Sequence, residues 1–104
     1  MTQVAKGYEK RRYRRVKGPF SGRHIGSTKT HVFVTDLNLG GGFITFTGEK
    51  PPSSMFVLRI NLHDGPINVN AQTVHRDQLG HGVRFVNLDV ATAARLARTI
   101  DSIH

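Results

Sequence analysis

One stretch of the chain alternates apolar and polar side chains more strictly than any other. From Phe56 to Leu62 an apolar residue stands at every second position, and Arg59 and Asn61 stand between them. Successive side chains of a β-strand point to opposite faces, so this period places all the apolar side chains on one face. The stretch therefore predicts a strand in a sheet that buries one of its two faces.

Weaker versions of the same period occur on both sides of this strand. The pattern shifts near Thr73 and Val74, which predicts a β-bulge there. Gly, Pro, Asn and Asp gather between the alternating stretches and indicate tight turns. The other predicted strands cover 20–25, 31–35, 43–47, 67–74 and 82–86, and the turns cover 36–42, 50–54, 63–66 and 77–80.

After Phe85 the apolar period changes from two to nearly four, which indicates an amphipathic helix. Asn87 or Asp89 is placed to cap its first turn. The apolar face consists of Ala93, Leu96 or Ala97, Ile100 and Ile103. The residues alone thus predict an all-β fold, a small antiparallel barrel or sandwich, with one C-terminal helix over residues 89–103.

Length and composition narrow the class of protein. A chain of 104 residues is long enough for one domain with a single core. It has no cysteine, so disulfides and thiolate zinc sites are excluded and a reducing cytoplasm is expected. No apolar run reaches the ~18 residues of a membrane span, and no secretory leader is recognisable. We expect a soluble cytoplasmic protein that does not insert into a membrane.

The positive charge of the chain is concentrated near its beginning. The formal net charge is +8, and residues 1–30 hold nine Lys or Arg against Glu9 alone. Five of these cations lie within the six residues from Lys10 to Arg15. Arginine presents a planar fork of donors that matches a phosphate or a guanine edge, so the expected partner is anionic. The alternative is a solvated basic arm that makes only loose electrostatic contacts.

Little in the sequence points to catalysis or to a metal. The six histidines show no ligand spacing and are expected on the surface or in turns, and the seven acidic residues are scattered. No Ser or Thr lies in a nucleophile elbow. Gly80 and Gly82 do not form a phosphate-binding loop and are expected to serve a turn or close packing. We therefore expect no enzymatic activity, no metal and no cofactor.

The turn that begins at Asp36 combines groups that suit a ligand. Asp36 supplies a carboxylate, Asn38 an amide, and Gly41 a backbone that a ligand can approach closely. A carboxylate at this place could accept paired N–H bonds from a guanine edge. The alternative is an Asx turn that only connects two strands.

These residues resemble the PilZ domain family of bacterial receptors for the second messenger cyclic di-GMP. The family pattern is Arg-x-x-x-Arg near the N-terminus, followed by Asp/Asn-x-Ser-x-x-Gly at the first strand turn. Arg11 and Arg15 match the first element, and Asp36, Asn38 and Gly41 occupy the second. A Gly-Val-x-Phe segment at residues 82–85 and the closing helix extend the resemblance over roughly residues 9–103.

The resemblance implies a six-stranded antiparallel barrel with a C-terminal helix and a non-enzymatic function in signalling. It implies that Arg11 and Arg15 grip the phosphate and guanine of cyclic di-GMP, while Asp36, Asn38 and Gly41 complete the pocket. The other basic residues of the arm would add positive field and stacking: Lys10, Arg12 and Arg14. The expected division is a flexible lead-in 1–9 and a single domain 10–104, with a ligand-binding arm 10–17, a barrel 20–86 and a helix 89–103.

One position departs from the family pattern, because Asn38 stands where the family has a small serine. A PilZ-like protein-interaction module that does not bind the nucleotide is therefore one alternative function. A basic small barrel that binds nucleic acid is another, although five of the six Phe lie in the predicted strands that follow residue 30 and leave few aromatic rings for bases. In the favoured interpretation, the arm folds over the nucleotide and changes the surface offered to an unidentified downstream protein.

Overall fold

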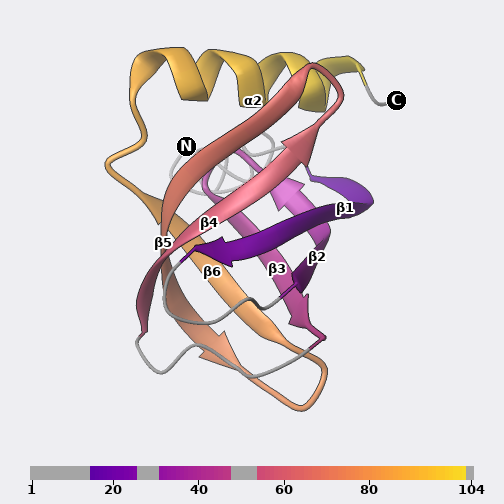
Figure 1. Cartoon of the computed structure of the whole chain (residues 1–104), viewed down its shortest axis with the longest axis vertical. Coiled ribbons are helices and arrows are strands. Elements are labelled where there is room, and N and C mark those ends of the chain that lie inside the picture. Colours follow the sequence, from indigo (N-terminus) through magenta and orange to yellow (C-terminus); the bar gives the residue numbers. More distant parts are fainter. Residues whose placement is uncertain (1–14, 26–30, 48–53, 103–104) are drawn as a thin grey trace, which may run out of the picture.

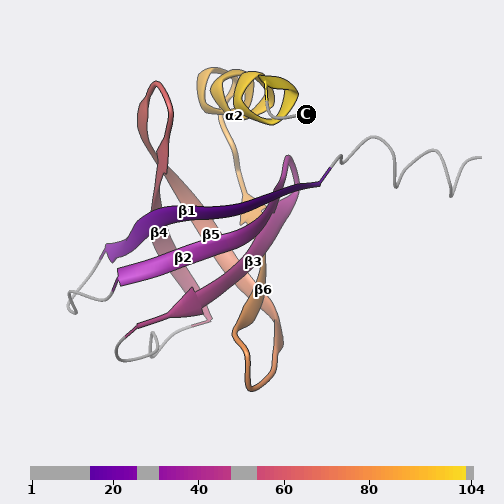
Figure 2. The same cartoon turned by 90° about the vertical axis from the view of Figure 1, so that its right-hand side faces the viewer.

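The computed structural model describes residues 15–25, 31–47 and 54–102. Its six strands form a closed antiparallel barrel in the order β1-β2-β3-β6-β5-β4, and one helix covers an end of it (Figures 1 and 2). The elements are β1 (Val16–Ile25), β2 (His31–Asn38), β3 (Gly41–Phe46), β4 (Met55–Leu62), β5 (Gly65–Arg76), β6 (His81–Val86) and α2 (Val90–Ser102). The predicted all-β barrel with a C-terminal helix is confirmed.

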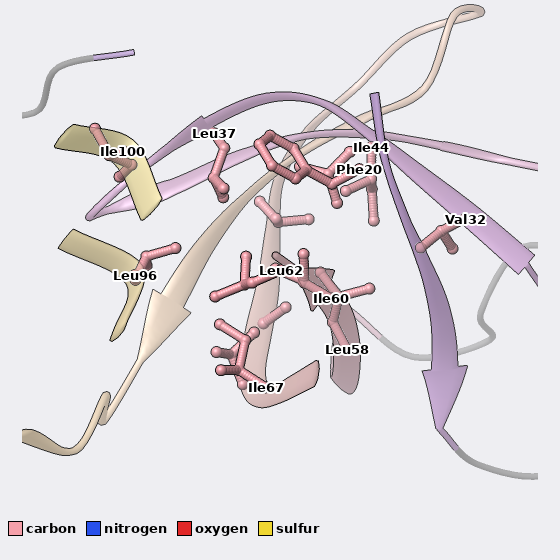
Figure 3. Packing of buried hydrophobic residues seen from close by; sticks show 14 of the residues in the cluster. Phe20, Val32, Leu37, Ile44, Leu58, Ile60, Leu62, Ile67, Leu96 and Ile100 are labelled. Carbon is pink, nitrogen blue, oxygen red and sulfur yellow. The ribbon is translucent and has the colours of Figure 1, made fainter. Parts of the chain in front are cut away.

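The period-two strand β4 contributes the centre of the barrel interior. Phe56, Leu58, Ile60 and Leu62 are all buried, as their alternation predicted. Leu58 and Ile60 are completely inaccessible, and Ile60 pairs with Ile67 of the neighbouring strand β5 (Figure 3). Burying each such aliphatic side chain stabilises the fold by about 1.5–3 kcal/mol.

Helix α2 closes one end of the barrel. Leu96 and Ile100 project from the helix into the core beside Leu37 (Figure 3). Of the two predicted N-cap residues, Asp89 caps the helix, because its Oδ1 accepts the N–H of Thr92 at 2.7 Å. Asn87 instead adopts a left-handed backbone with φ 54° between β6 and the helix.

An arginine of the helix fastens it to the hairpin between β4 and β5. Arg95 donates to the carboxylate of Asp64 at 3.0 Å and to the carbonyl oxygens of Gly65 and Pro66 at 2.9 and 3.1 Å. The hydrogen bond from Arg95 to the carboxylate holds the pKa of Asp64 below its ordinary value. The helical period had placed Arg95 outside the apolar face, and the structure gives it this docking role.

A bulge in β2 decides which of its side chains face outward. Val34 pairs with Ile44 of β3 whereas Asp36 pairs with Phe43, so Thr35 is an extra residue. It shifts the alternation by one position, and the next buried residue after Val34 is Leu37. Without the bulge Asp36 would share the inward face of Val34.

The predicted turn over residues 36–42 is too long. β2 continues to Asn38 and β3 begins at Gly41, so Leu39 and Gly40 alone form the turn. Asp36, Asn38 and Gly41 therefore lie on paired strands rather than in a loop. β1 is also longer than predicted, because it begins at Val16 and pairs from there with Leu37.

The predicted bulge in β5 is confirmed. Thr73 pairs with Val83 of β6 and His75 pairs with Gly82, which leaves Val74 as the extra residue. Val74 is 59% exposed. The bulge thus places an apolar side chain on the outer surface of the barrel.

The expectation that the histidines lie on the surface or in turns is wrong for two of them. His24 and His81 are buried, at 5% and 2% exposure. The ring of His24 packs 5.3 Å from that of Phe56, and the ring of His81 packs 4.9 Å from that of Phe46. Both imidazoles fill core positions as flat rings against phenylalanines.

Among the described residues, no helix combines the length and the hydropathy that a membrane span requires.

Candidate functional site

A row of side chains crosses the outer surface of five neighbouring strands in register. Lys17 of β1 pairs with Asp36 of β2, and Asp36 pairs with Phe43 of β3. Phe43 pairs with Gly82 of β6, and Gly82 with His75 of β5. Gly82 has no side chain, so the surface is hollow between Phe43 and His75.

The hollow is part of a cleft of about 370 Å³. This volume lies within the ~300–1,000 Å³ of small-molecule sites. The cleft brings together residues from the start of β1, the β2–β3 hairpin, the β5 bulge and β6. Its lining consists of Arg15, Asp36, Asn38, Gly40, Gly41, Gly42, Phe43, Val74, Gly82 and Val83.

Arg15 reaches the cleft because β1 runs alongside the end of β2. The residue after it, Val16, pairs with Leu37, which lies between Asp36 and Asn38. Arg15 itself is exposed and lines the cleft. The other predicted basic site residues lie outside the described part of the chain: Lys10, Arg11, Arg12 and Arg14.

Asp36 supplies negative charge to the cleft. Its side chain is 26% exposed, and the ammonium of Lys17 lies 3.1 Å from Oδ1. Oδ1 is buried and accepts no hydrogen bond within the described ranges, so its contact with Lys17 is an ion pair without hydrogen-bond geometry. The carboxylate therefore keeps acceptor capacity for N–H donors of a ligand.

The side chain of Asn38, the last residue of β2, stabilises the turn to β3. Its Oδ1 accepts the backbone N–H of Gly40 at 2.7 Å, which is the Asx turn weighed as an alternative from the sequence. The oxygen is thus committed to the turn, and the amide NH₂ group is the part of Asn38 that can donate to a ligand.

Gly41 has a packing role at the floor of the cleft. A Cβ at this position would collide with the carbonyl oxygen of Val83 on β6. Glycine therefore lets β3 and β6 pair closely beneath the cleft. This role explains the glycine without a ligand, and it also brings the backbone within reach of one.

The apolar walls of the cleft were not predicted from the sequence as site residues. Phe43 is partly buried and Val74 exposed, and both line the cleft together with Gly82. The predicted bulge near Val74 was the available signal, because a bulge re-aims one side chain outward. Aromatic and aliphatic walls suit the flat face of a base.

No group of three or more His, Asp or Glu that could hold a metal occurs within residues 15–25, 31–47 and 54–102.

Fold and cleft together define a small β-barrel with a surface cleft that combines an arginine, a carboxylate, an amide and apolar walls. The sequence model of the PilZ domain matches residues 9–102, nearly the whole chain. No curated protein matches at a significant level. The chain belongs to the PilZ domain family, which is the family of cyclic di-GMP receptors, and the resemblance seen in the sequence is confirmed.

Proposed function

We propose that this protein is a non-enzymatic receptor for cyclic di-GMP. One observation carries the proposal: Arg15 and the hairpin residues Asp36, Asn38 and Gly41, some twenty positions apart in the sequence, line one cleft. Arg15, Asp36 and Gly41 match the family pattern, and Asn38 occupies the position at which the pattern has serine. The volume of the cleft and its apolar walls add support.

Each group of the site has a role that follows from its chemistry. Arg15 and Arg11 donate charge-assisted hydrogen bonds to phosphate and guanine, each contributing about 1.5–3 kcal/mol. Asp36 accepts N–H bonds of a guanine edge, and Asn38 donates from its amide. Gly41 lets the ligand approach the backbone. The remaining cations of the arm raise the local positive potential: Lys10, Arg12 and Arg14.

The proposed output is a change in the surface offered to a partner. Arg15 lies immediately before β1, so a ligand held by it and by Arg11 would order the arm against the barrel. We propose that this bacterial, cytoplasmic receptor then signals to a downstream protein. The nucleotide acts as a second messenger and is not converted.

A second candidate function is a protein-interaction module that does not bind the nucleotide. Two contacts favour it. The side-chain oxygen of Asn38 accepts the N–H of Gly40, and Lys17 forms an ion pair with Asp36. Both polar groups of the hairpin therefore have partners within the chain. Serine at position 38, as in the family pattern, is smaller than this asparagine.

Calorimetric titration with cyclic di-GMP tests the receptor function directly. Arg11→Ala and Arg15→Ala should each abolish measurable binding and leave the melting temperature nearly unchanged, because both residues precede the first strand of the barrel and Arg15 is exposed. Arg76→Ala removes an exposed arginine that does not line the cleft, and it should bind like the wild type. Wild-type affinity in both arm variants would refute the proposed site.

Filling the cleft provides an independent test. A Cβ at Gly82 would meet the side chain of His75 at 3.4 Å, an ordinary contact, so Gly82→Val should fold. Its branched side chain would occupy the hollow beside Phe43 and weaken binding at least tenfold. If this variant is folded and binds normally, the ligand lies elsewhere.

A further inference from the structure

A second row of side chains crosses the outer surface of the barrel away from the cleft. Arg23 of β1 pairs with His31 of β2 on one side and with Arg59 of β4 on the other. Arg59 in turn pairs with Asn68 of β5. All four side chains are exposed, and none of them lines the cleft described above.

The electrostatics of this row are unfavourable without a bound anion. Arg23 and Arg59 stand directly opposite each other, and like charges at paired positions repel. Within the described ranges, neither arginine forms an ion pair with a carboxylate. Asn68 accepts the Nε–H of Arg59 at 3.2 Å, which orients the guanidinium without neutralising it. An anion between the two arginines would relieve the repulsion.

Two adjoining hollows lie over β1 and β4 beside these arginines, and together they are called the groove. One hollow of about 320 Å³ holds Arg23, His31 and Arg59, and the next, of about 410 Å³, holds Lys17 and His63. Both hollows are lined by Ser21 and Asn61, whose side chains are joined by a hydrogen bond of 2.9 Å.

The length of the groove selects an extended ligand. Six positions separate Lys17 from Arg23 on β1, which corresponds to at most about 20 Å at ~3.3 Å per residue, because the strand is irregular between Lys17 and Phe20. Cationic side chains stand at both ends of this path. A chain of several negative charges fits it better than a single compact anion.

An exposed aromatic ring lies at the edge of the groove. Phe33 of β2 is 39% exposed and pairs with Ser21. It is therefore a diagonal neighbour of Arg23, at a typical distance of ~7–8 Å. The sequence disfavours nucleic acid because most of the phenylalanines occupy predicted strands. Phe33 does lie on a strand, but it points outward.

We propose that this groove binds a single-stranded nucleic acid. Arg23 and Arg59 contact its phosphates, and a base stacks on Phe33. Arginines beside an exposed ring on a small barrel match the backbone charge and the flat bases of a single strand. An acidic peptide would use the arginines but would gain no stacking from the ring. The groove and the cleft are different surfaces, so this proposal does not rest on the function proposed above.

A single substitution at Phe33 provides a fluorescent probe of base stacking. The chain contains no tryptophan, so Phe33→Trp provides the only indole in the protein. Short oligouridylate and oligothymidylate should both quench its fluorescence, because the bases stack on it. Inorganic polyphosphate should bind without quenching. A stronger effect of either oligonucleotide would tell whether the groove prefers RNA or DNA.

The phosphate contacts are tested by the salt dependence of binding. Arg23→Gln and Arg59→Gln should each weaken oligouridylate binding several-fold and reduce the slope of log affinity against log salt by about 0.7. Arg76→Gln removes the same charge from the end of β5 and should leave both values nearly unchanged. Cyclic di-GMP affinity should not change in the two groove variants, which separates this test from that of the receptor site.

Two results would overturn the proposal. One is that Arg11→Gln with Arg15→Gln abolishes oligouridylate binding while Arg23→Gln with Arg59→Gln retains it, which would assign the binding to the basic arm. The other is that polyglutamate or polyphosphate binds through the two groove arginines while oligonucleotides never quench Trp at position 33. That outcome would indicate an acidic protein or polymer as the partner.

Discussion

Asn38 is the residue at which the requirements of the hairpin and of a ligand meet. Its oxygen accepts the N–H of Gly40, and it lines the cleft beside Asp36. A serine hydroxyl can accept the same N–H bond, as in turns that begin with serine, and it leaves more room. Serine can therefore replace Asn38 in the turn, but the replacement should change the affinity for the ligand.

We expect Asn38→Ser to keep or tighten cyclic di-GMP binding. The gain should reach on the order of 1 kcal/mol, about fivefold in affinity, because serine crowds a guanine less. Calorimetry on the wild type and the variant measures it. A clear loss of affinity would instead show that the amide makes a contact that serine cannot replace.

The residue types of the site could be predicted from the sequence, but their orientation could not. Asp36, Asn38 and Gly41 were selected as members of a loop, whereas they lie on paired strands. The outward direction of Asp36 depends on the extra residue Thr35. The apolar period does shift between Val34 and Leu37, but the strand was predicted to end at Thr35, so the bulge was not predicted. Phe43 was missed because its role depends on its neighbours in other strands.

Among the elements, helix α2 depends on its cap. Asp89 accepts the N–H of Thr92, and this bond holds the pKa of Asp89 below its ordinary value of 3.8. The folded state therefore prefers the ionised carboxylate. This contribution to stability is complete above the ordinary pKa and is lost as the pH falls through the lower pKa of the folded state.

We expect Asp89→Asn to make the stability of the protein less sensitive to acid. Asparagine also caps helices but does not titrate in this range. Stability near pH 7 should remain close to that of the wild type, and the decline between about pH 5 and pH 2 should be shallower. Urea unfolding followed by circular dichroism at several pH values measures both effects.

A matched variant separates the cap from the charge. Asp89→Ala removes the cap and should lower stability at neutral pH as well. An Asp89→Asn variant with the full acid sensitivity of the wild type would contradict the assignment. Some sensitivity should remain in either variant, because the pKa values of Asp64 and Asp77 are also lowered by hydrogen bonds from Arg95 and from the N–H of Leu79.

The predictability of the elements follows their local signals. β4 was predictable because its strict alternation matches its burial. β1 was underestimated, because Gly18 and Pro19 interrupt its pattern while its pairing with β2 continues past them. The buried positions of His24 and His81 depend on phenylalanines contributed by other strands. Contacts between strands thus decide what the sequence leaves open.

At the scale of the whole molecule, the barrel and the helix share one core. Leu96 is fully buried where α2 closes the barrel, whereas Val90 at the start of the same helix is 86% exposed. Leu96→Ala should lower the free energy of unfolding by about 2–5 kcal/mol. Val90→Ala should change it by less than about 0.5 kcal/mol. Urea denaturation measures both, and similar values for the two variants would show that the helix does not share the core.

The ion pair between Lys17 and Asp36 connects the cleft with the groove. Asp36 lines the cleft, and Lys17 lines one end of the groove. If a guanine that binds Asp36 also displaces Lys17 from the carboxylate, the ammonium can contact a phosphate in the groove. Each proposed ligand should then raise the affinity for the other by the same factor, since linkage is reciprocal.

The size of this coupling is limited by the pair itself. Lys17 is 83% exposed, and exposed ion pairs contribute at most about 1 kcal/mol, so the factor should not exceed about fivefold. Oligouridylate affinity measured with and without saturating cyclic di-GMP gives its value, and Lys17→Gln should reduce it to one. If the coupling factor is the same in Lys17→Gln as in the wild type, the coupling between the two sites does not depend on Lys17. If the two sites were not coupled at all, the barrel would bind its two ligands independently. If Lys17 couples them, the affinity of each site depends on whether the other site is occupied.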